Sequence, residues 1–337
     1  MLRQTPGGKG ISRCGKYEFK FNDDIEEPDF WVVRNKHIRK RQKATINPDN
    51  TILMLSEPLS VMSYPKSYCN QFGMLCSCQE WKKHRNVHYM QAVLPWFVGI
   101  NPKTWQVTNP DVCYDYLKTH PFPQKTKLIS VITSNKAATK GHQARIEFVK
   151  KLKQHYGDLI DVFGNGVNNF DDKWDVLAPY KYHISIENTS SKYYWTEKIS
   201  DCYLAGTFPI YYGCTNIGDY FPKDSYKTID INDFEGAVKI IDSIIEGELY
   251  SQQATQDALE HAKNLVLEDY NMFNVIAKCC DGLNPNAPKR KVTLKPAVTM
   301  FDWRNVYREV VQRNFFKLKK KLFGTGNINP NDCQNSK

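Results

Sequence analysis

Short apolar runs and amphipathic segments alternate along the chain between residues 125 and 247. The apolar runs are typical of buried strands, whereas apolar residues that recur every three or four positions are typical of helices with one buried face. Strands are predicted at residues 127–134, 159–166, 182–188, 207–213 and 226–231, and helices at residues 142–157, 196–206 and 233–247. This alternation, with short connections, predicts a parallel sheet with helices on both faces, as in a Rossmann-like lobe.

The first part of the chain has a less regular pattern. Strands are predicted at residues 16–22, 30–33 and 51–58, and the basic run at residues 34–43 predicts exposed surface. The last predicted strand ends in a Ser-Glu-Pro step that contains Glu57.

The organisation expected from these patterns is an α/β protein of two lobes. A chain of 337 residues is long enough for two domains with a cleft between them. We expect an N-terminal lobe at residues 1–122 and a C-terminal lobe at residues 123–284. A linker and a basic helical tail are expected at residues 285–337.

The composition of the chain limits the classes of binding partner that are expected. The formal net charge of +10 favours an anionic partner, which includes nucleic acid, a membrane surface and a phosphate-bearing small molecule. The ten cysteines lack the spacing of a zinc site, so free thiols are expected. Because no long apolar run and no signal-peptide pattern occurs, a cytoplasmic protein is expected.

The start of the helix predicted at residues 196–206 is the first candidate for chemistry. Ligands of a doubly wound sheet lie beyond the carboxyl ends of the strands, where helices begin. Glu187 and Asn188 follow one strand, and Thr196, Glu197 and Lys198 open the next helix. Lysine at a helix N-terminus suits a diphosphate and glutamate suits a ribose diol. The alternative is a capped helix with Thr196 as its N-cap residue.

A second candidate follows the strand predicted at residues 127–134. Ser134 and Asn135 end that strand, and Arg145 lies near the start of the following helix. Arginine can hold diphosphate oxygens in a bidentate manner, although a solvated helix residue is the simpler interpretation. The chain contains no Asp-x-Asp step, so a divalent cation is not expected to be essential, and Arg145 and Lys198 would carry the charge of a leaving diphosphate.

Residues 180–222, "YKYHISIENTSSKYYWTEKISDCYLAGTFPIYYGCTNIGDYFP", resemble the α1,3/4-fucosyltransferases, glycosyltransferase family 10. The family pattern includes Phe-Glu-Asn, Tyr-x-Thr-Glu-Lys and Pro-Ile-x-x-Gly steps in this order. The resemblance implies a GT-B fold, in which two Rossmann-like lobes flank the active site. It also implies inverting transfer of L-fucose from GDP-β-L-fucose to a glycan hydroxyl, for which O3 of GlcNAc or Glc is expected.

The same resemblance assigns roles to residues. It implies that Arg145 and Lys198 bind the diphosphate and that Glu197 binds the ribose. It places Tyr194 and Asn188 near the nucleotide and the fucose, with Asn135 close by. It implies that Glu57 is the general base, with Glu187 as the alternative. Trp195 stands where the family often has valine, which suggests a reshaped pocket wall or bulkier packing.

The sequence of the basic tail is compatible with two kinds of contact. Apolar residues at helical spacing face basic residues across the segment at residues 305–323. Such a helix can lie on an anionic membrane surface or pack on its own protein. The remaining alternatives are another GDP-deoxyhexose as donor, a non-catalytic glycan-binding protein, and a nucleic-acid-binding protein. No nucleic-acid-binding module is recognised, so nucleic acid is not expected as the partner.

Overall fold

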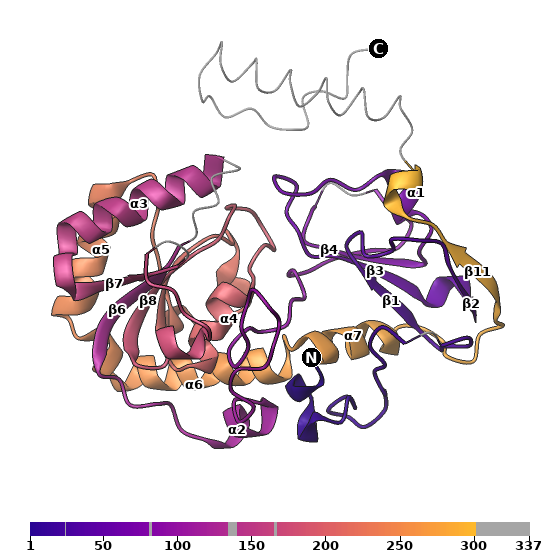
Figure 1. Cartoon of the computed structure of the whole chain (residues 1–337), viewed down its shortest axis with the longest axis horizontal. Coiled ribbons are helices and arrows are strands. Elements are labelled where there is room, and N and C mark those ends of the chain that lie inside the picture. Colours follow the sequence, from indigo (N-terminus) through magenta and orange to yellow (C-terminus); the bar gives the residue numbers. More distant parts are fainter. Residues whose placement is uncertain (24, 81–82, 134–139, 165–166, 301–337) are drawn as a thin grey trace, which may run out of the picture.

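The computed structural model describes residues 1–23, 25–80, 83–133, 140–164 and 167–300. Ser134, Asn135 and the basic tail at residues 305–323 lie outside these ranges. The described chain forms two lobes that lie side by side, each built on its own parallel sheet (Figure 1). The predicted GT-B type of architecture, an α/β protein with two parallel-sheet lobes, is therefore confirmed. Among the described residues, no helix combines the length and the apolar character needed to cross a bilayer.

The C-terminal lobe contains a five-stranded parallel sheet in the order β10-β9-β8-β6-β7. Its strands are β6 (Lys127–Ile132), β7 (Ile160–Phe163), β8 (Tyr180–Ile186), β9 (Phe208–Tyr212) and β10 (Lys227–Thr228). A strand forms in each predicted region, and β6 to β9 bury apolar residues in the core of the lobe. Strand β10 is shorter than predicted and exposed, whereas Ile229 and Ile231 just after it are buried. The chain steps from β6 outward to β7 and then returns to β8, so the strand order reverses between β6 and β8. Ligands of doubly wound sheets bind at such a reversal point.

Helices cover this sheet on two sides. They are α3 (Lys140–Tyr156), α4 (Glu197–Leu204), α5 (Phe234–Glu246) and α6 (Gln253–Glu268). Helices α3 and α5 meet through the rings of Phe148 and Phe234, while α4 packs with α6 (Figure 1). The three helices predicted from the sequence therefore form, and α3 and α4 begin directly after the region where the strand order reverses. The short helix α2 (Tyr114–Thr119) also contacts α6.

The N-terminal lobe contains a four-stranded parallel sheet in the order β1-β3-β4-β5. Its strands are β1 (Trp31–Arg34), β3 (Thr51–Leu55), β4 (Met74–Ser77) and β5 (Val87–Tyr89), and the short helix α1 (Lys66–Cys69) lies between β3 and β4 in sequence. The strand predicted at residues 16–22 does not form. Its aromatic residues pack on a helix instead, as when the Phe19 ring meets the Phe273 ring edge-on at 4.9 Å. The basic run is also less exposed than predicted, because Asn35 and Ile38 are buried.

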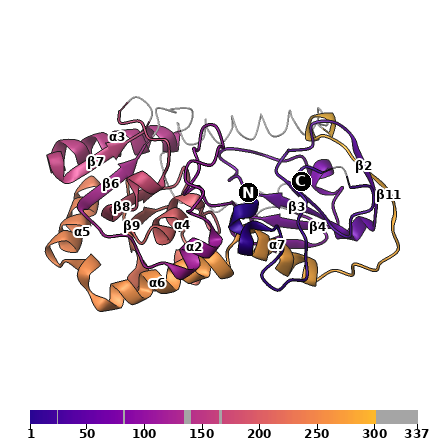
Figure 2. The same cartoon turned by 60° about the horizontal axis from the view of Figure 1, so that its bottom comes forward.

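The chain returns to the N-terminal lobe after α6. Helix α7 (Met272–Asp281) packs against the N-terminal sheet, where Phe273 and Ile276 join one apolar cluster with Ile52 and Met74 (Figure 2). The structure therefore differs from the lobe boundary expected at residue 284. The segment expected to be a linker also contains a strand, β11 (Arg290–Leu294), which pairs antiparallel with β2 (Gln42–Ile46). The sequence pattern does not predict β11, because most of its residues are charged or polar and only Leu294 is fully buried.

Candidate active site

The N-terminus of α4 lies against the end of β8. Thr196 is the N-cap residue, and its Oγ1 accepts a hydrogen bond from the backbone N–H of Lys198 at 3.4 Å. The Thr196 hydroxyl and backbone N–H both donate to Glu187 Oε1 at 2.8 Å. The predicted cap is therefore confirmed, and it also fixes Glu187 beneath the first turn of α4.

Glu187 is enclosed at this position. Only 1% of the residue is exposed, and its Oε2 accepts a hydrogen bond from Lys198 Nζ at 3.0 Å. A Cβ atom on Gly213, just after β9, would lie 2.4 Å from Glu187 Cγ, so the backbone closes over the carboxylate. Burial raises the pKa of Glu187, and the contacts with Lys198 and Thr196 oppose this effect. Glu187 therefore holds Lys198 and Thr196 in place rather than facing a substrate.

Three further charged side chains continue from Lys198 into the lobe. Glu197 lies 3.5 Å from the amino groups of both Lys198 and Lys173, and Lys173 lies 2.9 Å from Asp201. Burial favours a neutral Glu197, but the two lysines outweigh it and hold its pKa at about 2. The contacts with Glu187 and Glu197 raise the pKa of Lys198 although burial lowers it. Lys198 and Glu197 are therefore both charged near neutral pH.

Lys198 and Glu197 keep part of their surface open. Their side chains are 24% and 12% exposed, whereas the side chain of Asp201 is 1% exposed. Asp201 also accepts a hydrogen bond from the backbone N–H of Phe97 at 2.9 Å, which ties α4 to the segment between the lobes. Lys173 and Asp201 were not predicted as site residues. The spacing of Glu197 and Asp201, one helical turn apart, is a signal for Asp201, whereas no local pattern indicates Lys173.

Arg145 extends from α3 across the point where the strand order reverses. Its Nη1 donates to Asn188 Oδ1 at 2.9 Å, and the residue is 6% exposed. Burial lowers the pKa of Arg145 and the charge of Glu187 opposes this effect, while the Arg145 charge in turn acts to lower the pKa of Lys198. The structure therefore brings Arg145 and Lys198, predicted separately, into one site with Asn188.

Glu57 faces this site from the N-terminal lobe. It follows β3 and is half-buried. Burial raises its pKa, Lys198 opposes this, and Glu197 adds to it, so the Glu57 carboxyl lies within electrostatic reach of the α4 N-terminus. Arg34, at the end of β1, also acts on this carboxyl. The predicted base therefore lies close enough to Lys198 and Glu197 for their charges to act on it.

Asn35 fixes the turn that carries Glu57, and no sequence pattern indicates this role. Its φ of 51° lies in the left-handed region, which asparagine tolerates better than most residues. Its Oδ1 accepts hydrogen bonds from the Ser56 N–H at 2.7 Å and from the Tyr64 hydroxyl at 2.6 Å. Gln79 Nε2 donates to the Glu57 carbonyl oxygen at 2.8 Å.

Tyr194 and Trp195 are buried. Tyr194 is 2% exposed and packs with Cys78 and Ala92 from the other side of the cleft, so it forms part of the contact between the lobes. Trp195 meets the rings of Tyr220, Phe221 and Tyr270 edge-on. Of the two interpretations of Trp195, the structure supports bulkier packing. In the described ranges, no three His, Cys, Asp or Glu side chains are arranged to hold a metal ion.

Loops of the two lobes meet beside the site. The ring of Tyr89 stacks on that of Tyr193 at 5.9 Å, and Lys192 pairs with Glu80 at 3.6 Å. A hydrogen bond between Ser60 and Thr189 adds a third connection. These contacts bring the end of β5 and the turn after Glu57 against the loop that precedes α4.

The C-terminal lobe is thus a doubly wound α/β lobe with two cations and two carboxylates at its reversal point. Residues 122–255 match the family model described as "Glycosyltransferase family 10 (fucosyltransferase) C-term". The alpha-(1,3)-fucosyltransferase FucT of Helicobacter pylori is 35% identical over 86 residues. The 4-galactosyl-N-acetylglucosaminide 3-alpha-L-fucosyltransferase 9 of Mus musculus is 32% identical over 136 residues.

These matches are partial. They cover 25% and 36% of this chain, and they span 17% and 35% of the two relatives. The crystal structure of an alpha1,3-fucosyltransferase with GDP has a TM-score of 0.44 and 19% identity, and it covers 72% of both chains. The structure described as containing GDP-fucose has a TM-score of 0.42 and 18% identity over 72% of this chain and 71% of the other.

Proposed function

We propose that the protein is an inverting α1,3-fucosyltransferase. It moves L-fucose from GDP-β-L-fucose to a hydroxyl, O3 of GlcNAc or Glc, of an oligosaccharide or a lipopolysaccharide-type glycan. The family of residues 122–255 and the names of the relatives support this proposal. The observation that carries it is the position of Glu57 opposite the α4 N-terminus, where Lys198 and Arg145 converge.

The donor side of the proposal depends on α4. A helix N-terminus offers backbone N–H groups and a partial positive charge, to which Lys198 and Arg145 add two full charges. These groups bind the diphosphate and stabilise the negative charge that develops as GDP leaves. Glu197 is ionised and partly open, so it can accept hydrogen bonds from ribose hydroxyls. We propose that no divalent cation is required.

The acceptor side depends on Glu57. Inversion takes place in one displacement, in which the acceptor oxygen bonds to C1 of fucose as the bond from C1 to the phosphate oxygen breaks. The electron pair of the broken bond leaves with GDP, and Glu57 takes the acceptor proton as the new bond forms. A raised pKa makes Glu57 a better base than an ordinary surface carboxylate. Glu187 is a weaker candidate because it is enclosed and already accepts hydrogen bonds on both oxygens.

We also propose a place of action. The basic amphipathic pattern at residues 305–323 suits contact with an anionic membrane surface, so the enzyme would work in the cytoplasm at the inner face of the membrane. Retention on anionic but not neutral vesicles tests this proposal, and retention on neither would contradict it.

Calorimetry in EDTA tests the donor site. GDP-fucose, GDP-mannose and UDP-galactose are compared on the wild type, on Lys198→Ala and on Lys227→Ala, a matched change at an exposed lysine of β10. Selective binding of GDP-fucose that survives EDTA, falls with Lys198→Ala and persists in Lys227→Ala is expected. Preference for another GDP-sugar would change the donor, and no binding of any guanine nucleotide would reject the transferase.

A further inference from the structure

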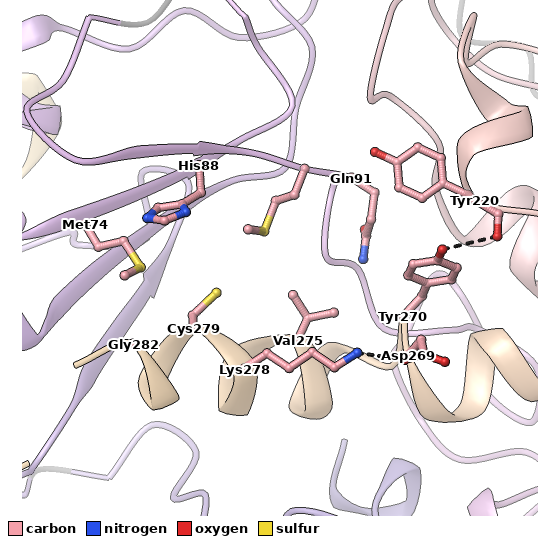
Figure 3. Close-up of a pocket in the computed structure, with 11 residues that line it drawn as sticks. Met74, His88, Gln91, Tyr220, Asp269, Tyr270, Val275, Lys278, Cys279 and Gly282 are labelled. Carbon is pink, nitrogen blue, oxygen red and sulfur yellow. Dashed lines mark hydrogen bonds and ion pairs between the residues drawn. The ribbon is translucent and has the colours of Figure 1, made fainter. Parts of the chain in front are cut away.

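A cavity of about 330 Å³ lies between the two lobes and α7 (Figure 3). Met74, Met90, Val275 and Cys279 give it an apolar surface, and Tyr220 and Tyr270 line its other end. The volume falls within the range of small-molecule sites, and such sites are mostly apolar with a few placed polar groups.

One buried polar group points into this cavity. Gln91 is 4% exposed, and its Oε1 accepts a hydrogen bond from the backbone N–H of Val93, which fixes the orientation of the amide. The Nε2 atom therefore faces the cavity, as Figure 3 shows, and it has no hydrogen-bond partner among the described residues. A buried donor without a partner is destabilising, so its presence indicates that a ligand or a water molecule completes it.

The ion pair at the rim of the cavity and the apolar side chains of its wall favour one class of ligand. Lys278 at the rim already pairs with Asp269 at 2.7 Å, so it does not attract an anion strongly. A sugar would set hydroxyl groups against Met74, Met90 and Val275, whose side chains offer no hydrogen bond. An aromatic ring fits better, because tyrosine rings and methionine sulfurs make favourable contacts with ring edges and faces.

We propose that this cavity binds a small aromatic molecule that carries one carbonyl or ether oxygen, which accepts a hydrogen bond from Gln91 Nε2. The site lies outside the proposed fucosyltransfer site, and the proposal does not depend on that activity. The cavity is nevertheless connected to it, because Tyr220 and Tyr270 pack on Trp195, the residue before the α4 cap. A ligand in the cavity therefore contacts two of the rings that pack on Trp195, next to the N-cap residue Thr196.

Methionine-methyl NMR of the full chain tests this proposal. Acetophenone is titrated against α-methylstyrene, which has the same shape but a methylene in place of the carbonyl oxygen. Saturable shifts of the Met74 and Met90 methyl signals are expected, while Met62, in a separate cluster, stays unchanged. Acetophenone is expected to bind about fivefold more tightly or better, which corresponds to one net hydrogen bond. No shift at Met74 or Met90, or equal affinity for the two probes, would overturn the proposal.

Two variants separate the hydrogen bond from the cavity itself. In Gln91→Leu the two probes should bind with equal affinity, because the donor is absent; a preference for acetophenone that persists would overturn the role of Gln91. In Val275→Phe the added ring should fill the cavity and abolish the shifts at Met74 and Met90. Unchanged binding in this variant would place the probes elsewhere and reject the site.

Discussion

Lys198 Nζ lies 3.0 Å from Glu187 Oε2, and this contact joins a partly open cation to a fully enclosed carboxylate. Glu187 cannot be reached by a substrate, but its charge keeps Lys198 protonated and directs it to the head of α4. Glu187 therefore acts as a positioning residue for Lys198, whose side chain keeps part of its surface open.

Removing Lys198 should affect both stability and binding. Lys198→Met leaves the buried Glu187 charge without its partner, so the free energy of unfolding should fall by about 3 kcal/mol. Adding Glu187→Gln should recover most of this loss, because a neutral amide needs no counter-ion, but it should not recover donor affinity. Urea unfolding and calorimetry on the two single variants and the double variant measure both effects. Recovery of donor affinity in the double variant would mean that Lys198 does not contact the donor.

Glu57→Gln should abolish most of the turnover without weakening donor binding. Loss of a general base typically lowers kcat by about 10²- to 10⁴-fold. Because Glu57 belongs to the N-terminal lobe, the affinity for GDP-fucose should stay within about twofold of the wild-type value. Glu235→Gln, at an exposed position of α5, is the control. A variant at position 57 that keeps its kcat would move the base to another residue.

Activity should depend on the protonation of Glu57. Burial holds its pKa above the usual 4.5, so the carboxylate becomes protonated and inactive as pH falls through a value higher than 4.5. The acid limb of the kcat/KM profile is therefore expected above that pH. A limb at or below it would indicate that another group controls the reaction.

Glu197 should make stability depend on pH in the acid range. Its pKa is about 2 in the folded protein and 4.5 as the ordinary value, so the unfolded chain takes up the proton first as pH falls. The contribution is present above 4.5 and is lost between 4.5 and about 2, with an upper limit of about 3 kcal/mol. Urea unfolding across this range should show a steeper loss for the wild type than for Glu197→Gln. Parallel curves would remove the stabilising role of Lys173 and Lys198 toward Glu197.

Asn35 offers a test of how the Glu57 turn is held. Asn35→Ala removes two buried hydrogen bonds and leaves alanine at a φ of 51°, so we expect a loss of about 2 to 3 kcal/mol in unfolding free energy. Asn35→Gly removes the same hydrogen bonds but tolerates that φ, so it should lose less. Both variants should lower kcat at unchanged donor affinity. Equal stability of the two would show that the backbone conformation contributes little.

Local sequence patterns were sufficient to predict most strands and helices of the C-terminal lobe. Its longer strands are short segments rich in apolar and aromatic residues, and the Thr196-Glu197-Lys198 step is a helix start that a short stretch of sequence specifies. The position of Lys173 was not predictable, because it depends on a loop that reaches the α4 face from another part of the chain. The meeting of Glu57 with α4 rests on the arrangement of two lobes, and only the family resemblance indicated it. Apolar residues at 16–22 were misinterpreted because their partner, α7, lies more than 200 residues further along.

The antiparallel pair of β2 and β11 has a consequence for how the protein is made. The core of the C-terminal lobe comes almost entirely from one continuous stretch, so it can fold as soon as that stretch leaves the ribosome. The N-terminal lobe lacks α7 and β11 until Leu294 has been synthesised, although its other strands are made first. The N-terminal lobe is therefore translated before the C-terminal lobe but is completed after it. Its first strands remain in an incomplete sheet while the C-terminal lobe folds.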